Sequence, residues 1–127
     1  MTGYIQNIED LTLKNENFRK VLFTAQHTQL VIMSLKPTEE IGLETHAIVD
    51  QFLRIELGEG KVIIDGEEHV IKNGDAIVVP AGATHNVINT SLDKPLKLYT
   101  VYSPPHHLDG VVHITKLDAE NDTEDHL

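Results

Sequence analysis

The chain contains no cysteine among its 127 residues. Disulfides and thiolate metal sites are therefore both excluded, and any bound metal must be held by nitrogen and oxygen ligands. Eight histidines and twenty acidic residues are available as such ligands. The length fits one domain that is large enough for a single hydrophobic core.

Long apolar runs and a basic N-terminus are also missing. The first ten residues, MTGYIQNIED, contain neither the basic nor the apolar region of a signal peptide, and no apolar run approaches membrane-spanning length. We therefore expect a cytoplasmic protein that has no membrane partner.

Basic residues are scarce, with 10 lysines and arginines against 20 acids and a net charge of -10. Nucleic acid is an unsuitable partner because its phosphates require clustered positive charge. Half of the excess lies after residue 117, where five acids have no neighbouring base. We expect a single domain over residues 1–117, beginning with an N-terminal arm of about 18 residues, and a disordered acidic tail over residues 118–127.

What the chain does contain is a series of short β-rich runs separated by turn formers. Strong turn signals, such as Asp65-Gly66, recur about every 8 to 12 residues, and outside the arm and the tail no helical periodicity lasts longer than a turn or two. The pattern predicts an all-β domain. We expect strands over residues 19–24, 29–35, 43–46, 51–57, 61–64, 67–71, 76–79, 95–103 and 111–115, with a further strand that begins at His85.

The stretch from Gly74 to Asn89 contains a turn, a buried strand over residues 76–79 and a second turn. Pro80-Ala81-Gly82 stops that strand, and His85 begins the next one. A histidine placed just after such a corner points into the space that the sheet encloses. His85 is therefore a candidate metal ligand.

The spacing of this stretch resembles the second conserved motif of the cupin superfamily at every position: Gly74, Pro80, Gly82, His85 and Asn89. The resemblance covers residues from about 37 to 103. It implies a cupin β-barrel, also described as a double-stranded β-helix or jelly roll.

The first cupin motif, Gly, five residues, His-x-His, three or four residues, Glu, six residues and Gly, is similar to the segment ending at Gly58. Thr38, Glu44 and Gln51 stand where that motif has its first Gly, first His and Glu. Carried over residue by residue, the resemblance implies a divalent metal held by Glu44, His46, Gln51 and His85.

The expected strand geometry agrees with this ligand set. Glu44 and His46 are two residues apart and so face the same way, and Gln51 opens the inward face of the next strand. Two imidazoles and one carboxylate suit Zn, Ni, Fe or Mn as divalent ions. Gln51 would be a weak ligand or an outer hydrogen-bond donor, and the neighbouring Asp50 remains an alternative to it.

The Pro104-Pro105 pair holds the following histidines rigidly, so His106 is a candidate proton donor if it enters the site. Glu44 is the second candidate catalytic residue. The other histidines of this region, His107 and His113, and the earlier His27 could line the mouth of the site or be ordinary loop residues.

The implied ligands, two His, one Glu and one Gln, also resemble the zinc site of phosphomannose isomerase-type cupins, with Glu and Gln in exchanged order. The resemblance implies an isomerase-like enzyme whose small-molecule ligand is oxygenated, such as a sugar phosphate. A metal-dependent dioxygenase on an enolisable or diketone substrate and a non-catalytic small-molecule-binding cupin are the alternatives. Apolar residues on both faces of residues 30–35 indicate that an outer surface is covered, by a homodimer partner or by the N-terminal arm.

Overall fold

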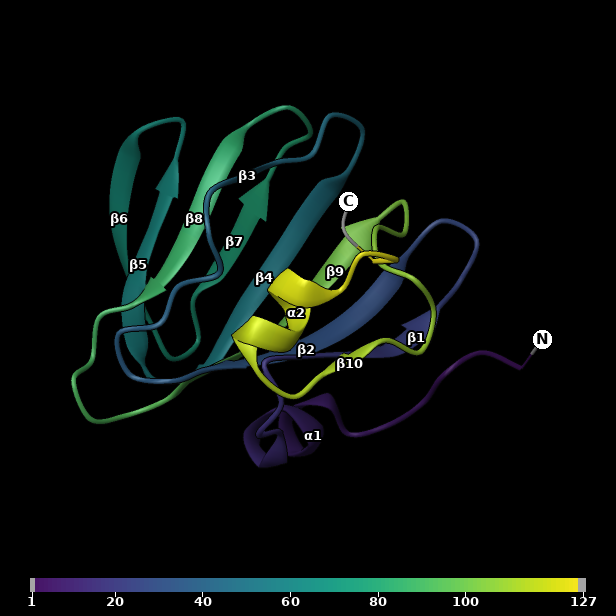
Figure 1. Ribbon diagram of the computed structural model, residues 1–127, viewed down its shortest axis with the longest axis horizontal. Helices are drawn as coiled ribbons and strands as arrows, with labels where there is room; N and C mark the ends of the chain where they lie inside the picture. Colours follow the sequence, from purple (N-terminus) through teal and green to yellow (C-terminus); the bar gives the residue numbers. More distant parts are fainter. Residues whose placement is uncertain (1, 126–127) are drawn as a thin grey trace.

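The computed structural model describes residues 2–125 and consists of two antiparallel sheets with a short helix near each end of the described chain (Figure 1). The larger sheet has the order β10-β1-β2-β9-β4-β7 and the smaller one the order β3-β8-β5-β6. The strands are β1 (Arg19–Thr24), β2 (Gln29–Leu35), β3 (Glu44–Thr45), β4 (Asp50–Leu57), β5 (Glu59–Ile64), β6 (Glu67–Lys72), β7 (Ala76–Val79), β8 (Thr84–Asn89), β9 (Leu96–Ser103) and β10 (Val112–His113). The all-β prediction is confirmed.

The two sheets face each other across the hydrophobic core. On β4, Gln51, Leu53 and Ile55 are buried on the inner face, whereas Phe52 and Arg54 lie on the opposite face and are only partly buried. This alternation is the one that the sequence predicts, because successive side chains of a strand point to opposite faces of its sheet. The polar Gln51 therefore lies at one end of an otherwise apolar inner row.

The outer face of the larger sheet is covered by the N-terminal arm. Helix α1 (Ile8–Lys14) begins at Asn7, whose side chain accepts a hydrogen bond of 2.9 Å from the backbone N–H of Asp10. It packs on β2, β4 and β9. The arm thus accounts for the apolar residues on the outer face of β2.

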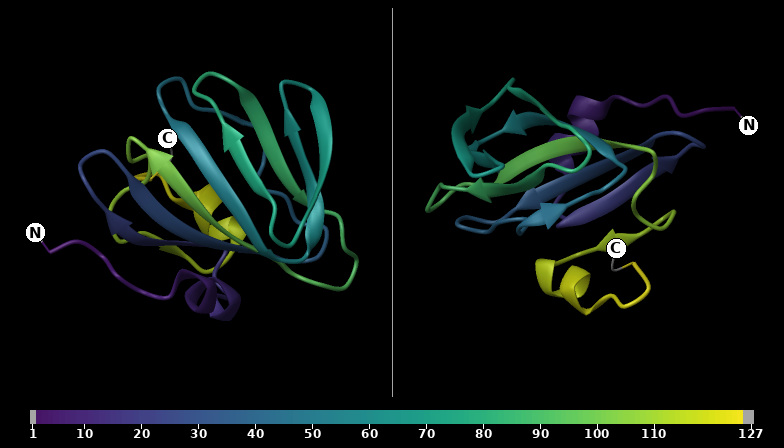
Figure 2. Two further views of the ribbon diagram at one scale, coloured as in Figure 1. Left: turned by 180° about the vertical axis from the view of Figure 1, so that it is seen from behind. Right: turned by 90° about the horizontal axis from the view of Figure 1, so that it is seen from above.

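The C-terminal segment differs from the expected disordered tail. Helix α2 (Lys116–Asn121) begins with a capping box between Thr115 and Asp118, and Asp125 beyond it is buried. Figure 2 shows α2 and α1 on opposite sides of the larger sheet. The run of five acids without a neighbouring base predicted disorder, but Asp125 and Asp122 accept hydrogen bonds from His107 and His113 and so hold the segment against the domain. Residues 126 and 127 lie outside the described part.

Two expected strands are shorter than their β-rich runs. The run over residues 43–46 forms strand only at Glu44–Thr45, and the run over residues 111–115 only at Val112–His113. Both lie at a sheet edge, where one neighbour alone decides how far pairing extends. Within residues 2–125, no helix has the length and apolar character needed to cross a membrane.

Candidate metal centre

The centre lies where the edge strand β3 meets β8 inside the fold. The two strands pair antiparallel with Glu44 directly opposite His85. Directly opposed residues of an antiparallel pair project to the same face of their sheet, so both side chains turn inward. His46 follows the last residue of β3 and is buried as well. Glu44 and His85 therefore face the same interior, and His46 lies one residue beyond the strand.

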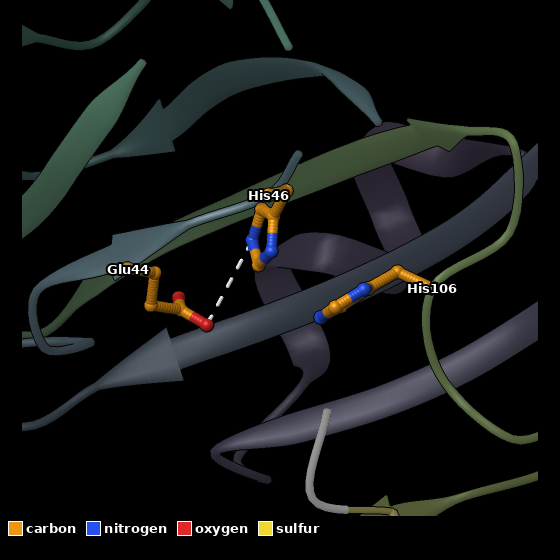
Figure 3. Close-up of side chains that lie close together, drawn as sticks. All are labelled: Glu44, His46 and His106. Carbon is orange, nitrogen blue, oxygen red and sulfur yellow. Dashed lines mark ion pairs between the residues drawn. The ribbon is translucent and has the colours of Figure 1, made fainter. Parts of the chain in front are cut away.

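One group of potential ligand atoms at the centre belongs to Glu44, His46 and His106, whose atoms all lie within 4.8 Å of one another (Figure 3). The Glu44 Oε2 to His46 Nε2 distance is 3.8 Å, and the ring centroids of His46 and His106 are 4.1 Å apart. His85 lies outside this group, with its ring centroid 5.2 Å from that of His46.

Three buried polar atoms of this region have no hydrogen-bond partner among the described residues: Nε2 of His46, Nε2 of His85 and Oε1 of Gln51. On His85 the other ring nitrogen, Nδ1, lies 3.2 Å from the carbonyl oxygen of Ala83. A proton on Nδ1 makes that hydrogen bond and leaves the lone pair of Nε2 free, which is the usual arrangement of a metal-bound histidine.

Gln51 is oriented in a comparable way. Its Nε2 donates a 3.0 Å hydrogen bond to the Thr100 hydroxyl, which leaves Oε1 as the free atom. Orphaned buried acceptors are unfavourable unless something binds them. Two free imidazole nitrogens, an amide oxygen and the Glu44 carboxylate fit a divalent cation.

The protonation states of the histidines at the centre also suit a bound cation. Burial, together with His106 and His85, lowers the pKa of His46 to about 4, so this imidazole is neutral at pH 7. Burial also lowers the pKa of His106 and raises the pKa of the Glu44 carboxyl. Desolvation is the largest cause of all three shifts, because burial disfavours the charged form of each group.

The position of Asp50 does not suit a metal ligand of this centre. Its side chain is exposed, and Oδ1 accepts a 2.8 Å hydrogen bond from the backbone N–H of Ala81. The carboxylate thus supports the Pro80-Ala81-Gly82 corner that precedes His85. His27 is exposed, whereas His113 is buried and bonded to Asp122.

His106 owes its placement to a residue that the sequence did not single out. Oε1 of Gln29 accepts from the backbone N–H groups of His106 (3.1 Å) and His107 (2.9 Å), and its Nε2 donates to the His107 carbonyl at 2.7 Å. The side chain of Gln29 is fully buried. Its place at the start of a β-rich run gave no sign of this role, because the partners lie 77 and 78 residues away.

Arg19 is the second residue that the sequence analysis missed. It is buried at the start of β1 and lines a cavity of about 220 Å³ together with Glu44 and His106. The alternation of β1, with Arg19 and Val21 turned inward and Lys20 exposed, carried the only available signal.

Comparison with known proteins agrees with the fold and the motif spacing. The chain is 49% identical over 122 residues to the uncharacterised protein YrkC of Bacillus subtilis. The aligned region covers 91% of this chain but only 65% of YrkC. It is 44% identical over 117 residues to an uncharacterised protein of Acanthamoeba polyphaga mimivirus, covering 89% of this chain and 72% of that protein. The chain thus spans about two thirds of the length of YrkC.

Among solved structures, the crystal structure of BH2720 from Bacillus halodurans superposes with a TM-score of 0.91 at 43% identity and covers 94% of both chains. Residues 31–102 match the cupin domain family, and this match includes Glu44, His46, Gln51 and His85. The chain belongs to the cupin family.

Proposed function

We propose that the protein is a divalent-metal-dependent enzyme acting on a small oxygenated molecule, with the cation held by Glu44, His46, His85 and Gln51. The observation that carries this proposal is the set of three buried polar side-chain atoms without hydrogen-bond partners in the described part of the chain, one each on His46, His85 and Gln51. A bound divalent cation would supply Lewis-acid polarisation of a carbonyl or enediol oxygen.

His106 and Glu44 are the residues proposed to move protons. Ligand atoms of both lie within 4.8 Å of each other and of His46, so a small molecule at the centre contacts both. A lowered pKa leaves His106 neutral and able to accept a proton at neutral pH. A neutral imidazole beside the bound molecule favours isomerisation by proton transfer, for which sugar phosphates are the first substrates to test.

Oxygenase chemistry is the second candidate, because two imidazoles and one carboxylate form the ligand set of many non-haem iron oxygenases. Its substrates would be enolisable compounds or diketones. Anaerobic turnover of a sugar phosphate supports the isomerase, whereas oxygen uptake with a diketone supports the oxygenase. If the metal is retained but neither reaction occurs, the protein is a binding cupin rather than an enzyme.

Metal content decides whether the proposal stands. Protein purified without a histidine tag should contain close to one divalent ion per chain by elemental analysis, and adding the ion to stripped protein should raise the melting temperature. Finding no stoichiometric metal and no such rise would rule out the metal-dependent enzyme.

A further inference from the structure

The cavity at the mouth of the centre is lined by residues of both charges. Arg19 of β1 and Lys116 of α2 are its basic residues, and Glu44 and His106 of the proposed centre line it as well. Its volume is about 220 Å³, below the ~300–1,000 Å³ that is usual for pockets holding drug-sized ligands. A molecule of a few carbon atoms is therefore the size that fits.

Arg19 is 7% exposed, and no carboxylate among residues 2–125 lies within ion-pair distance of its guanidinium. Its Nε has no hydrogen-bond partner, and a terminal nitrogen lies 3.4 Å from Nδ1 of His113, a long contact. Its other contacts are uncharged: the Tyr102 hydroxyl, to which the guanidinium donates, and the ring of Phe18, whose centroid lies 5.2 Å from the guanidinium carbon. A buried guanidinium without a carboxylate beside it is unfavourable, so the arrangement favours an anion brought by a ligand.

None of the described acidic residues that line the cavity forms an ion pair with Arg19. Asp125 is engaged with Nδ1 of His107 (2.9 Å) and with the backbone N–H of Leu108 (2.6 Å). Glu44 belongs to the proposed metal centre, and Glu120 is exposed on α2. When a divalent cation offsets Glu44 and its neighbours, the two basic residues give the cavity a net attraction for anions.

We propose that Arg19, assisted by Lys116, binds the carboxylate or phosphate group of a small anionic ligand and so holds the rest of that ligand against Glu44, His46 and His106. This inference rests on the proposed function and narrows its substrate class to small molecules with one oxyanion group. The planar fork of an arginine suits both groups, since each offers two oxygens in one plane.

The test measures binding rather than turnover. Pyruvate and glycerol 3-phosphate serve as the carboxylate and phosphate probes, and glycerol is the uncharged control. Calorimetry is performed on wild type, Arg19→Gln, Arg19→Lys and Lys20→Gln, each with and without Ni²⁺. Lys20→Gln removes the same charge from the adjacent, exposed position of β1.

We expect at least one of the anionic probes to bind wild type and Lys20→Gln, and glycerol to bind neither. Arg19→Gln should bind that probe roughly 10- to 100-fold more weakly, as for the loss of a hydrogen bond to a charged group. Arg19→Lys should fall between the two because it keeps the charge and loses the fork. The identity of the probe that binds distinguishes a carboxylate from a phosphate ligand.

A purely structural role for Arg19 makes a different prediction. Arg19→Gln would then lower the melting temperature without probes, whereas relief of a buried charge should leave it equal or higher. Equal anion binding by Arg19→Gln and wild type, or no binding of either anion to wild type, overturns the inference. If no metal binds, the proposed function fails. The inference about Arg19 is then decided by comparing anion binding of metal-free wild type and metal-free Arg19→Gln.

Discussion

Gln51 is the residue at which this centre departs most from its family's motif, since it offers a neutral oxygen where the motif has a carboxylate. We predict that His46→Ala and His85→Ala each abolish metal binding, because each removes an imidazole nitrogen that nothing else in the described chain engages. Gln51→Ala should weaken binding by no more than about 100-fold, as for an outer or weak ligand. Isothermal titration with Ni²⁺ measures all three.

Two further variants sharpen this test. His69→Ala removes an exposed histidine of β6 and should leave affinity unchanged. His106→Ala should retain the metal, since its proposed role is proton transfer. If His106→Ala loses the metal as fully as His85→Ala, then His106 is a ligand; if Gln51→Ala does so, the ranking of the ligands is wrong.

Sequence alone was able to predict which inward positions carry Glu44, His46, Gln51 and His85, because strand alternation and corner spacing are local properties. The roles of Gln29 and Arg19 could not be found in this way. Gln29 bonds a loop 77 residues further along the chain, and Arg19 meets Glu44 only after two sheets have assembled. Strand alternation turns Arg19 inward, but the partners of both residues are set by tertiary contacts that a local pattern does not encode.

At the scale of elements, the segment around α2 closes one side of the cavity. Buried Asp125 holds it through His107 and the backbone of Leu108. We predict that Asp125→Ala lowers the free energy of unfolding by ~1–3 kcal/mol, because the buried His107 ring and the partly buried N–H of Leu108 lose their acceptor. Urea denaturation followed by circular dichroism measures the change.

Glu124→Ala is the matched control for this variant, because it removes an exposed carboxylate one residue earlier. It should change stability by less than about 0.5 kcal/mol. Equal effects of the two substitutions would mean that Asp125 does not anchor the segment. The sequence predicted disorder for this segment from its many acids. Composition does not show which acid will be buried beside a histidine, and so it could not predict the anchoring role of Asp125.

The same segment should make stability depend on pH. Burial and the Arg19 guanidinium lower the pKa of His107 to about 3, against the opposing effect of Asp125. Between the ordinary histidine value of about 6.5 and 3, the unfolded chain therefore binds a proton that the folded chain excludes. The contribution is fully present above pH 6.5 and is lost as pH falls through that window.

We predict that the melting temperature of wild type falls between pH 6.5 and 4, and that His107→Gln shows a shallower fall because it has no proton to take up. His46, whose pKa is also lowered, to about 4, contributes in the same direction and remains in both proteins. Calorimetric scans across this range give both slopes. Identical slopes for the two proteins would contradict the prediction.

At the scale of the whole molecule, two apolar side chains remain uncovered on neighbouring sheet edges. Val70 of β6 is 85% exposed and Val78 of β7 is 65% exposed, and both line one groove. β6 and β7 are each an edge strand of their sheet, so they also present backbone groups without strand partners on one side. Because α1 already covers the outer face of β2, β4 and β9, we place a second copy at these two edges rather than on that face.

We therefore predict a homodimer in solution, with a mass by light scattering of twice the 14.2 kDa of one chain. The double variant Val70→Glu and Val78→Glu should be monomeric, because a symmetric interface brings like charges together. Leu92→Glu, equally exposed in the loop between β8 and β9, should remain dimeric. A monomeric wild type, or a double variant that dimerises as well as wild type, would show that these edges are not the interface.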